Sequence, residues 1–269
     1  MSANRGRIFS GASVACGYPE LPERVLPRLC RLGIKSFEIF FNTHSELEPE
    51  YVGELKGILD DYGAECISVH PFTCGSDTYM LYSGYKRRAQ DYIEYHKRYF
   101  EAMNLLGARY FVLHGNKSES APDSVVFEGY LRLDDCARSF GVRVLQENVV
   151  RCTTGRLEQL VRMKKALGDR AGFVLDTKQA VSSGYDPTQF VYALGDSIKH
   201  IHFSDHGPAG DCLLPGAGEL DTVGFIEALN SVGFSGGVIL ELYRRNFGRY
   251  EELSAGVRDI QSAIDTVLG

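Results

Sequence analysis

The chain has 269 residues and a formal net charge of −6, with 44% hydrophobic and 24% charged residues. This length fits one large α/β barrel domain, and the composition is that of an ordinary soluble globular protein. The acidic balance argues against a nucleic-acid partner, because proteins that neutralise a phosphate backbone carry a basic surface.

A helical stretch, a glycine and an apolar β-branched run recur along the whole chain. In chain order, the predicted strands are residues 8–14, 36–41, 65–70, 109–114, 142–147, 172–176, 198–203 and 237–242. The helical patterns lie near residues 21–32, 50–61, 84–106, 123–140, 156–167, 187–194, 221–232 and 250–268. The glycines between helix and strand are Gly33, Gly63, Gly107, Gly141, Gly168, Gly195 and Gly233. A glycine is expected there, because helices commonly end in a left-handed residue that glycine adopts at low cost.

The predicted strands are near-continuous apolar runs, such as residues 110–113, Tyr-Phe-Val-Leu. Such runs are typical of a parallel sheet that is covered on both faces. Eight strand–helix units without a linker or a break in composition predict an α/β fold, a closed (β/α)8 TIM barrel that forms a single domain over residues 1–269. An open doubly wound sheet is the structural alternative.

Potential metal ligands follow or end most of these strands, at the face where barrel enzymes work. The side chains concerned are Glu38, His70, His114, Glu147, Asp176, His200, His202 and Glu241. Singly, each could be a solvated or hydrogen-bonded strand end. The last four strands supply Glu147, Asp176, His202 and Glu241. Three carboxylates in one barrel mouth would repel each other without a cation, so we predict that these four residues hold one divalent metal ion.

The donor set and the spacing refine this prediction. Oxygen-rich ligation favours Mn²⁺ or Mg²⁺, and Zn²⁺, Co²⁺ or Fe²⁺ also bind such donors. His200 and His202 stand two residues apart and therefore on the same face of a strand, and only one of them needs to be a ligand.

These residues resemble the xylose-isomerase-like barrels, the family that includes tagatose and psicose 3-epimerases, inosose dehydratase and endonuclease IV. The resemblance covers essentially the whole chain, and its most specific segments are QEN (146–148), LDT (175–177), HIHFSD (200–205) and LELY (240–243). It implies that Glu147, Asp176, His202 and Glu241 hold one metal, with Glu147 and Glu241 also acting as catalytic acid and base on opposite faces of the substrate. Relatives usually associate, so the resemblance also implies a homo-oligomer.

The chain departs from the family pattern at three places. Gln179 stands where members commonly carry the histidine of D-x-x-H, and Pro208 stands where the epimerases place a substrate-binding arginine. Residues 211–213, Asp-Cys-Leu, lack the D-x-H pair of endonuclease IV. His70 and His114 do stand where that enzyme has metal histidines, but the set for its three metals is incomplete. The epimerase substrate contacts therefore do not transfer, and an abasic-site endonuclease becomes the weakest alternative.

The predicted function is a metal-dependent sugar isomerase or epimerase that removes the proton next to a carbonyl through a metal-stabilised enediolate. The expected partner is a small-molecule keto-sugar or sugar phosphate. The main alternative is a metal-dependent lyase or dehydratase of a keto-sugar or keto-inositol, because the same groups support elimination. A non-catalytic sugar-binding barrel is a further alternative, motivated by Gln179 and Pro208.

Further side chains are expected around the substrate. The predicted substrate contacts are His70, His114, Lys178, Gln179 and Arg244. Arg245, like its neighbour, could bind a phosphate or a carboxylate. The aromatic residues Phe72, Tyr79, Tyr82 and Tyr85 are expected to form an apolar wall for a sugar face or an oligomer contact. The glycine-rich segment 207–219 is expected to form a rim or lid over the site.

Cysteine usage and the N-terminal segment predict a cytoplasmic location. Seven cysteines are scattered along the chain without a C-x-x-C pair, which is typical of reduced thiols and not of disulfides or a zinc ribbon. Residues 1–10 contain no apolar signal segment, and no apolar run approaches the roughly 18 residues that span a bilayer. We therefore expect no membrane partner.

Overall fold

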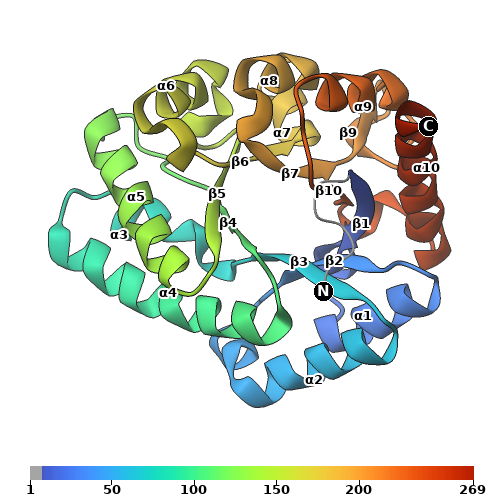
Figure 1. Cartoon of the computed structure of the whole chain (residues 1–269), viewed down its shortest axis with the longest axis horizontal. Coiled ribbons are helices and arrows are strands. Elements are labelled where there is room, and N and C mark those ends of the chain that lie inside the picture. The colour runs from blue at the N-terminus through green and yellow to red at the C-terminus, as the bar shows by residue number, and fades with distance from the viewer. Residues whose placement is uncertain (1–7) are drawn as a thin grey trace.

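Eight parallel strands close into a barrel in the order β1-β10-β7-β6-β5-β4-β3-β2. The computed structural model describes residues 8–269, so the first seven residues of the predicted domain and of its N-terminal segment lie outside the described residues. The barrel strands are β1 (Phe9–Ser13), β2 (Ser36–Phe40), β3 (Glu65–His70), β4 (Tyr110–Leu113), β5 (Arg143–Glu147), β6 (Phe173–Asp176), β7 (Ile198–Phe203) and β10 (Gly237–Leu240). They form the central ring in Figure 1. The predicted barrel is confirmed, and the open doubly wound sheet is wrong.

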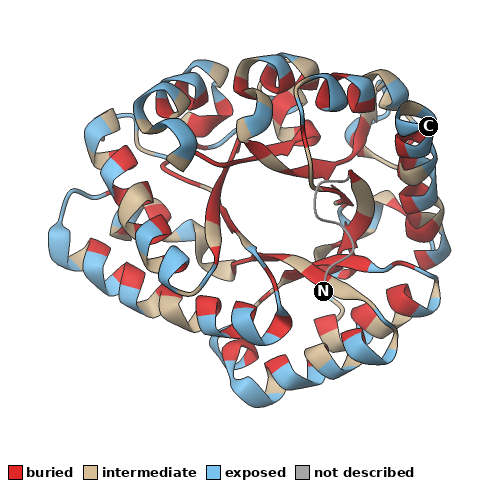
Figure 2. Cartoon of the chain, in the orientation of Figure 1, coloured by how far each residue is buried: buried red, intermediate tan, exposed pale blue. Residues whose placement is uncertain are grey.

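An outer ring of helices covers the barrel. The helices are α1 (Pro22–Arg31), α2 (Pro49–Asp61), α3 (Asp77–Met80), α4 (Lys86–Leu106), α5 (Asp123–Ser139), α6 (Leu157–Leu167), α7 (Thr177–Ser182), α8 (Pro187–Leu194), α9 (Thr222–Ser231) and α10 (Tyr250–Leu268). Eight of them match the predicted helices, while the short α3 and α7 follow β3 and β6. Figure 2 shows buried residues facing the barrel and exposed residues facing outward. Among the residues described, no helix has both the length and the apolar character of a membrane span.

The glycines between helix and strand have the predicted positive φ, but Gly168 and Gly195, with ψ −133° and −136°, lie outside the left-handed helical region and begin 3-10 turns. All seven have a positive φ, between 55° and 94°. Gly107 illustrates the reason, because it ends α4 with φ 77° and ψ 15°, the left-handed region that other residues enter at a cost. The chain can therefore turn directly from each helix into the next strand.

Alternation along the strands separates an outer core from the barrel interior. Phe111 of β4 faces outward and packs against Phe100 of α4, with ring centroids 5.6 Å apart. Val112, Leu145 and Val174 belong to a separate small apolar cluster on the opposite, inward face. Residues two positions beyond Leu145 and Val174 on β5 and β6 therefore also point inward, at the C-terminal mouth of the barrel.

The segment after β7 is a hairpin and not a simple loop. It consists of β8 (Asp205–Gly207) and β9 (Gly210–Leu213), paired antiparallel. The Asp205 carboxylate accepts hydrogen bonds from the backbone N–H groups of Gly218 and Leu220, both at 2.9 Å. A Cβ atom at Gly218 would lie 2.3 Å from the carbonyl oxygen of His206, so only glycine fits this close approach. The glycine-rich segment is thus fixed to the end of β7.

A buried carboxylate, Asp77, links α3 to the end of β4. Its Oδ1 accepts a hydrogen bond from the Tyr92 hydroxyl at 2.7 Å, and its Oδ2 accepts one from the Gly115 N–H at 3.3 Å. Asp77 is fully buried. Burial raises the pKa of Asp77 from 3.8 to about 7, against the lowering effect of these hydrogen bonds.

Asp77→Asn is expected to change how stability depends on pH. Between pH 4 and 7 the folded protein keeps a proton on Asp77 that the unfolded chain releases, so the free energy of unfolding falls as pH rises, by at most about 1.4 kcal/mol per pH unit. The amide that replaces the carboxyl group cannot ionise, so this contribution disappears and the variant should gain relative stability toward pH 7. Urea unfolding of the variant and the parent at several pH values measures how the free energy of unfolding depends on pH. The exposed Asp259→Asn on α10 is the control, and parallel pH profiles for Asp77→Asn and the parent would contradict the prediction.

Candidate metal centre

The four predicted ligands come together at the C-terminal mouth of the barrel. Glu147 and Asp176 are the last residues of β5 and β6, His202 lies in β7, and Glu241 follows β10 directly. Strand pairing places Asp176 opposite His202, and His202 opposite Ile239 of β10. One potential ligand atom from each of the four residues lies within 4.8 Å of those of the other three. The parallel register therefore brings residues far apart in sequence to one point.

His202 Nδ1 lies at the centre of this cluster. It is 3.3 Å from Glu147 Oε1 and 3.4 Å from Glu241 Oε2. Asp176 caps helix α7 with Oδ1, which accepts from the Gln179 N–H at 3.0 Å. Asp176 Oδ2 and Glu147 Oε2 are buried. Lys178 Nζ lies 3.5 Å from Asp176 Oδ2, and His114 Nε2 lies 3.0 Å from Glu147 Oε2.

Burial makes this arrangement costly without a cation. Glu147 and Asp176 are each 2% exposed, and a buried carboxylate loses hydration at a cost that its neighbours offset only in part. Burial raises the pKa of Asp176 to about 6, and the carboxylates of Glu147 and Glu241 add to the rise against the lowering effect of Lys178. Three carboxylates and one imidazole nitrogen are a donor set that suits a divalent ion, so the residues present fit one.

The imidazoles balance part of the negative charge. Burial raises the pKa of Glu147, but the charges and hydrogen bonds of His114 and His202 outweigh it and hold that pKa well below its usual range. The reciprocal effect raises the pKa of His202 well above its usual value, against burial, through Glu38, Glu241 and Glu147. Glu147 is therefore ionised at neutral pH.

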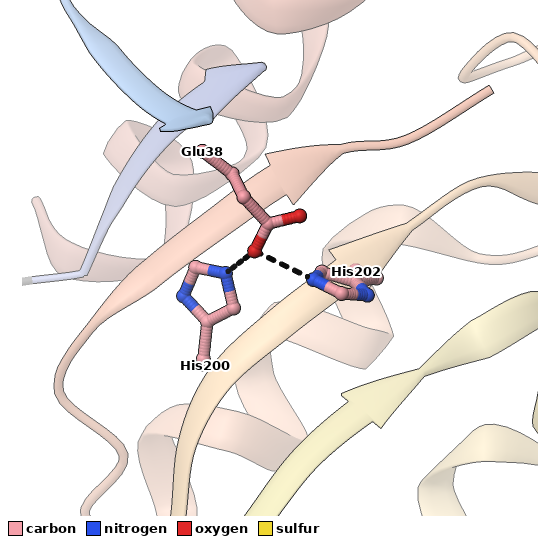
Figure 3. Close-up of side chains that lie close together, drawn as sticks. All are labelled: Glu38, His200 and His202. Carbon is pink, nitrogen blue, oxygen red and sulfur yellow. Dashed lines mark hydrogen bonds and ion pairs between the residues drawn. The ribbon is translucent and has the colours of Figure 1, made fainter. Parts of the chain in front are cut away.

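Glu38 of β2 holds the other nitrogen of His202 (Figure 3). Glu38 Oε2 lies 3.0 Å from His202 Nε2, 3.2 Å from His200 Nε2 and 2.8 Å from the Ser68 hydroxyl. Without a cation, Glu38, Glu241 and Glu147 favour the protonated form of His202. When a cation replaced the Nδ1 proton, Nε2–H would still donate to Glu38 and Nδ1 would face the cluster, which is how buried carboxylates orient histidine ligands. His200 contacts Glu38 from deeper in the barrel and does not join the four residues. This role of Glu38 was missed from the sequence.

His70 and His114 adjoin the cluster through Glu147. His114 Nε2 lies 3.0 Å from Glu147 Oε2 and 2.9 Å from His70 Nε2. His70 Nδ1 lies 3.2 Å from the carbonyl oxygen of Pro71, a contact that suits a proton on Nδ1 and a lone pair on Nε2. Together with Glu147 they form a further group of potential ligands. Both histidines therefore stand where the prediction puts substrate contacts.

Lys178 and Gln179 also lie at the mouth. Lys178 Nζ is 3.5 Å from Asp176 Oδ2, 3.9 Å from Glu241 Oε2 and 4.6 Å from the centre of the Tyr243 ring. Burial lowers the pKa of Lys178, but the Asp176 and Glu241 carboxylates raise it by more than burial lowers it. The net pKa is above its usual value, so the amine stays charged. Gln179 Oε1 accepts from the Val150 N–H at 3.0 Å, which holds this side chain beside the mouth.

Arg244 is the predicted substrate contact that the structure places elsewhere. Its guanidinium donates to the carbonyl oxygen of Phe247 at 2.8 Å and lies over the Phe247 ring. It lines a different pocket, together with Arg28 and Tyr250. The 3-10 turn Arg244–Asn246 directs the Arg244 side chain away from the mouth. The Arg245 guanidinium instead lies over the ring of Tyr243, which lines the mouth.

A cavity of about 450 Å³ opens over the cluster. Glu147, Asp176 and Glu241 line it, with the aromatic side chains of Tyr18, Phe40, Phe72 and Tyr243. The predicted aromatic wall is therefore correct for Phe72 only. Tyr82 is buried in the core, while Tyr79 and Tyr85 are exposed and flank Arg88. Segment 207–219 contributes no residue to this cavity and forms no lid over it, but its Asp211 lines the neighbouring cavity, so the segment lies at the rim.

Fold and site together define a closed α/β barrel with a buried carboxylate–imidazole cluster at the C-terminal ends of its strands. The model of the xylose isomerase-like TIM barrel family matches residues 27–265, so the chain belongs to that family.

Two inosose-converting enzymes are similar in sequence to part of the chain. Inosose dehydratase of Lacticaseibacillus casei is 28% identical over 134 residues, which cover 42% of this chain and 44% of that protein. Inosose isomerase of Bacillus subtilis is 30% identical over 125 residues, which cover 43% and 45%. The matches thus span less than half the length of these relatives.

Solved structures are similar over nearly the whole chain. A D-tagatose 3-epimerase-like protein superposes with a TM-score of 0.79 at 19% identity, covering 97% of this chain and 98% of that one. The 3-keto-D-glucoside 4-epimerase of E. coli gives a TM-score of 0.74 at 16% identity, covering 95% and 100%. At identities of 19% and 16%, the similarity to these two structures shows only that the fold is shared.

Proposed function

We propose that the chain is a divalent-metal-dependent sugar isomerase or epimerase that moves the proton next to a substrate carbonyl. The observation that carries the proposal is the convergence of Glu147, Asp176, His202 and Glu241, three carboxylates and one imidazole whose potential ligand atoms lie within 4.8 Å of one another. The sugar-epimerase structures and inosose-converting relatives support a sugar as the substrate class.

These four residues would hold the ion, with Mn²⁺ or Mg²⁺ favoured and Zn²⁺ or Co²⁺ as alternatives. When bound, a divalent cation supplies Lewis-acid polarisation of a carbonyl and of a neighbouring hydroxyl oxygen. The aromatic wall of the cavity packs on a sugar face and excludes water. Lys178 and the two histidines, His70 and His114, hydrogen-bond substrate oxygens around the reacting carbon.

Proton transfer is assigned to Glu147 and Glu241. They reach the cluster from β5 and from the end of β10, so they border the substrate from two sides of the barrel mouth. Glu147 is ionised and can accept the proton next to the carbonyl, while Glu241 returns a proton on the other face. Lys178 Nζ lies 3.5 Å from the Asp176 carboxylate and 3.9 Å from that of Glu241, and its charge lowers the pKa of Asp176 against the effect of burial.

A lyase or dehydratase is the second candidate, favoured by the similarity to inosose dehydratase. The same abstraction of a proton next to a carbonyl then leads to loss of a hydroxyl group in place of return of the proton. Products separate the two reactions, because a dehydratase yields an unsaturated or rearranged product with loss of water, and an epimerase yields a stereoisomer.

Solvent-deuterium incorporation tests the proposal. Protein loaded with Mn²⁺ is incubated in deuterium oxide with a panel of keto-sugars, keto-inositols and their phosphates, and label is located by NMR. We expect label at the carbon next to the carbonyl of at least one compound, and its loss when EDTA removes the metal. Absence of exchange across the panel with metal-loaded protein would contradict the assigned chemistry.

Glu38→Gln is expected to weaken metal binding although it replaces none of the four proposed ligands. The amide keeps the shape of the side chain but removes the charge that orients His202, and loss of such a partner typically lowers metal affinity about 10- to 100-fold. Calorimetric titration with Mn²⁺ measures the effect. The exposed Glu54→Gln on α2 is the charge-matched control. Equal affinity of Glu38→Gln and parent protein would show that Glu38 has no part in positioning His202.

A further inference from the structure

A second cavity adjoins the one over the carboxylate cluster. It has a volume of about 470 Å³, and both cavities are lined by His114, Lys178, Gln179 and Tyr243. Because these shared side chains form the border, the two cavities are neighbouring parts of one mouth. A ligand larger than a small keto-sugar can extend from the cluster into the second cavity.

The second cavity has the opposite charge to the first. Its lining includes the cationic side chains of Lys117, Arg151, Lys178 and Arg245. Its acidic side chain is Asp211, which accepts a hydrogen bond from the Ser182 hydroxyl at 2.7 Å. This excess of positive charge occurs in a chain with a net charge of −6. Such a local reversal of sign concentrates anions at the mouth.

Of the four cations of this cavity, Lys178 pairs with Asp176 and Glu241, and the other three are available to a ligand. Within residues 8–269, the exposed side chains of Lys117, Arg151 and Arg245 form no salt bridge. Lys178 Nζ and the Arg245 guanidinium both lie over the ring of Tyr243, at 4.6 Å and 4.8 Å from its centre. Two like charges that share one ring repel each other, and an anion bound beside them would offset that repulsion.

We propose that this cavity is an anion-binding subsite and that the substrate is a sugar with a phosphate or carboxylate group remote from its reacting carbonyl. The inference rests on the proposed function, because it places the carbonyl end at Glu147 and Glu241. The anionic end lies among Lys117, Arg151 and Arg245. Arginine pairs with phosphate or carboxylate through two parallel hydrogen bonds, and lysine adds a point charge, so the residue types suit both anions.

Ligand binding, measured without turnover, tests the subsite. Calorimetry on metal-free protein compares D-ribulose 5-phosphate with D-ribulose, and 5-keto-D-gluconate with L-sorbose. Charge-assisted hydrogen bonds should make at least one anionic ligand bind about tenfold or more tightly than its neutral partner. Preference for the phosphate or for the carboxylate identifies which anion the subsite takes.

Charge variants locate the effect. In the Arg151→Gln/Arg245→Gln double variant, the preference for the anionic ligand should fall to about twofold or less, while the neutral sugar binds as before. Lys165→Gln, an exposed charge removed from α6, should keep the parent preference. A preference below threefold for both anionic ligands in the parent protein, or one that survives in the double variant, would overturn the subsite.

The outcomes also separate this inference from the proposed function. Deuterium exchange into neutral keto-sugars with no anion preference would retain the isomerase proposal and remove the subsite. Tight, arginine-dependent binding of a sugar phosphate without any exchange would retain the subsite and remove the assigned chemistry.

Discussion

Glu147→Gln is expected to lower the rate of deuterium exchange at the carbon next to the carbonyl by about 1,000-fold or more, because general bases contribute 10²- to 10⁴-fold and this residue is also a proposed ligand. Glutamine keeps the size of the side chain and can still contact His114 and His202. It cannot accept the substrate proton. The comparison is made at saturating Mn²⁺, with metal content measured in parallel.

The matched control is Glu128→Gln, which removes an exposed carboxylate from α5. It should exchange deuterium at the parent rate. If Glu147→Gln also turned substrate over at the parent rate, the catalytic role of Glu147 would be wrong. Unchanged binding of a sugar, with no exchange by either the parent or the variant, would favour the alternative of a non-catalytic sugar-binding barrel.

Asp176→Asn should weaken the binding of Mn²⁺ by more than about 100-fold, since even partners that only orient a ligand are worth 10- to 100-fold. The side-chain oxygen of asparagine can still cap α7 by accepting from the Gln179 N–H, so the fold around the site is kept. The other buried oxygen, Oδ2, is replaced by an amide that cannot ligate a cation.

Stability measured in EDTA provides the second readout for Asp176→Asn. Removing one of three crowded carboxylates should leave the free energy of metal-free unfolding unchanged or raise it, because the burial of Asp176 and its repulsion with Glu147 and Glu241 together outweigh its attraction to Lys178. Added Mn²⁺ should stabilise the parent and not the variant. A variant that bound Mn²⁺ as tightly as the parent would show that Asp176 is not a ligand.

The barrel could be predicted because its signals are local. Each helix-ending glycine and each apolar run depends on a few neighbouring residues, and their repetition fixes the number of strand–helix units. The convergence of Asp176 and Glu241 also follows from topology alone, because the C-terminal ends of all strands in a parallel barrel meet at one face.

The parts that sequence missed depend on contacts between distant elements. Glu38 is the one charged residue of the apolar segment SFEIF of β2, and this position indicated that it needs a buried partner. The sequence could not identify the partner, because His202 lies 164 residues away. Arg244 was predicted at the mouth because it follows β10, and a 3-10 turn redirects it. Segment 207–219 was expected to form a rim or a lid; the Asp205 carboxylate ties it to β7, and it reaches the rim through Asp211 without covering the cluster.

Anomalous diffraction from crystals grown with Mn²⁺ would test the central claim most directly. We expect one strong peak per chain, in contact with Glu147, Asp176, His202 Nδ1 and Glu241, and its loss in Asp176→Asn. A chain without a peak at saturating Mn²⁺, or with a peak that is bound by other residues only, would contradict it.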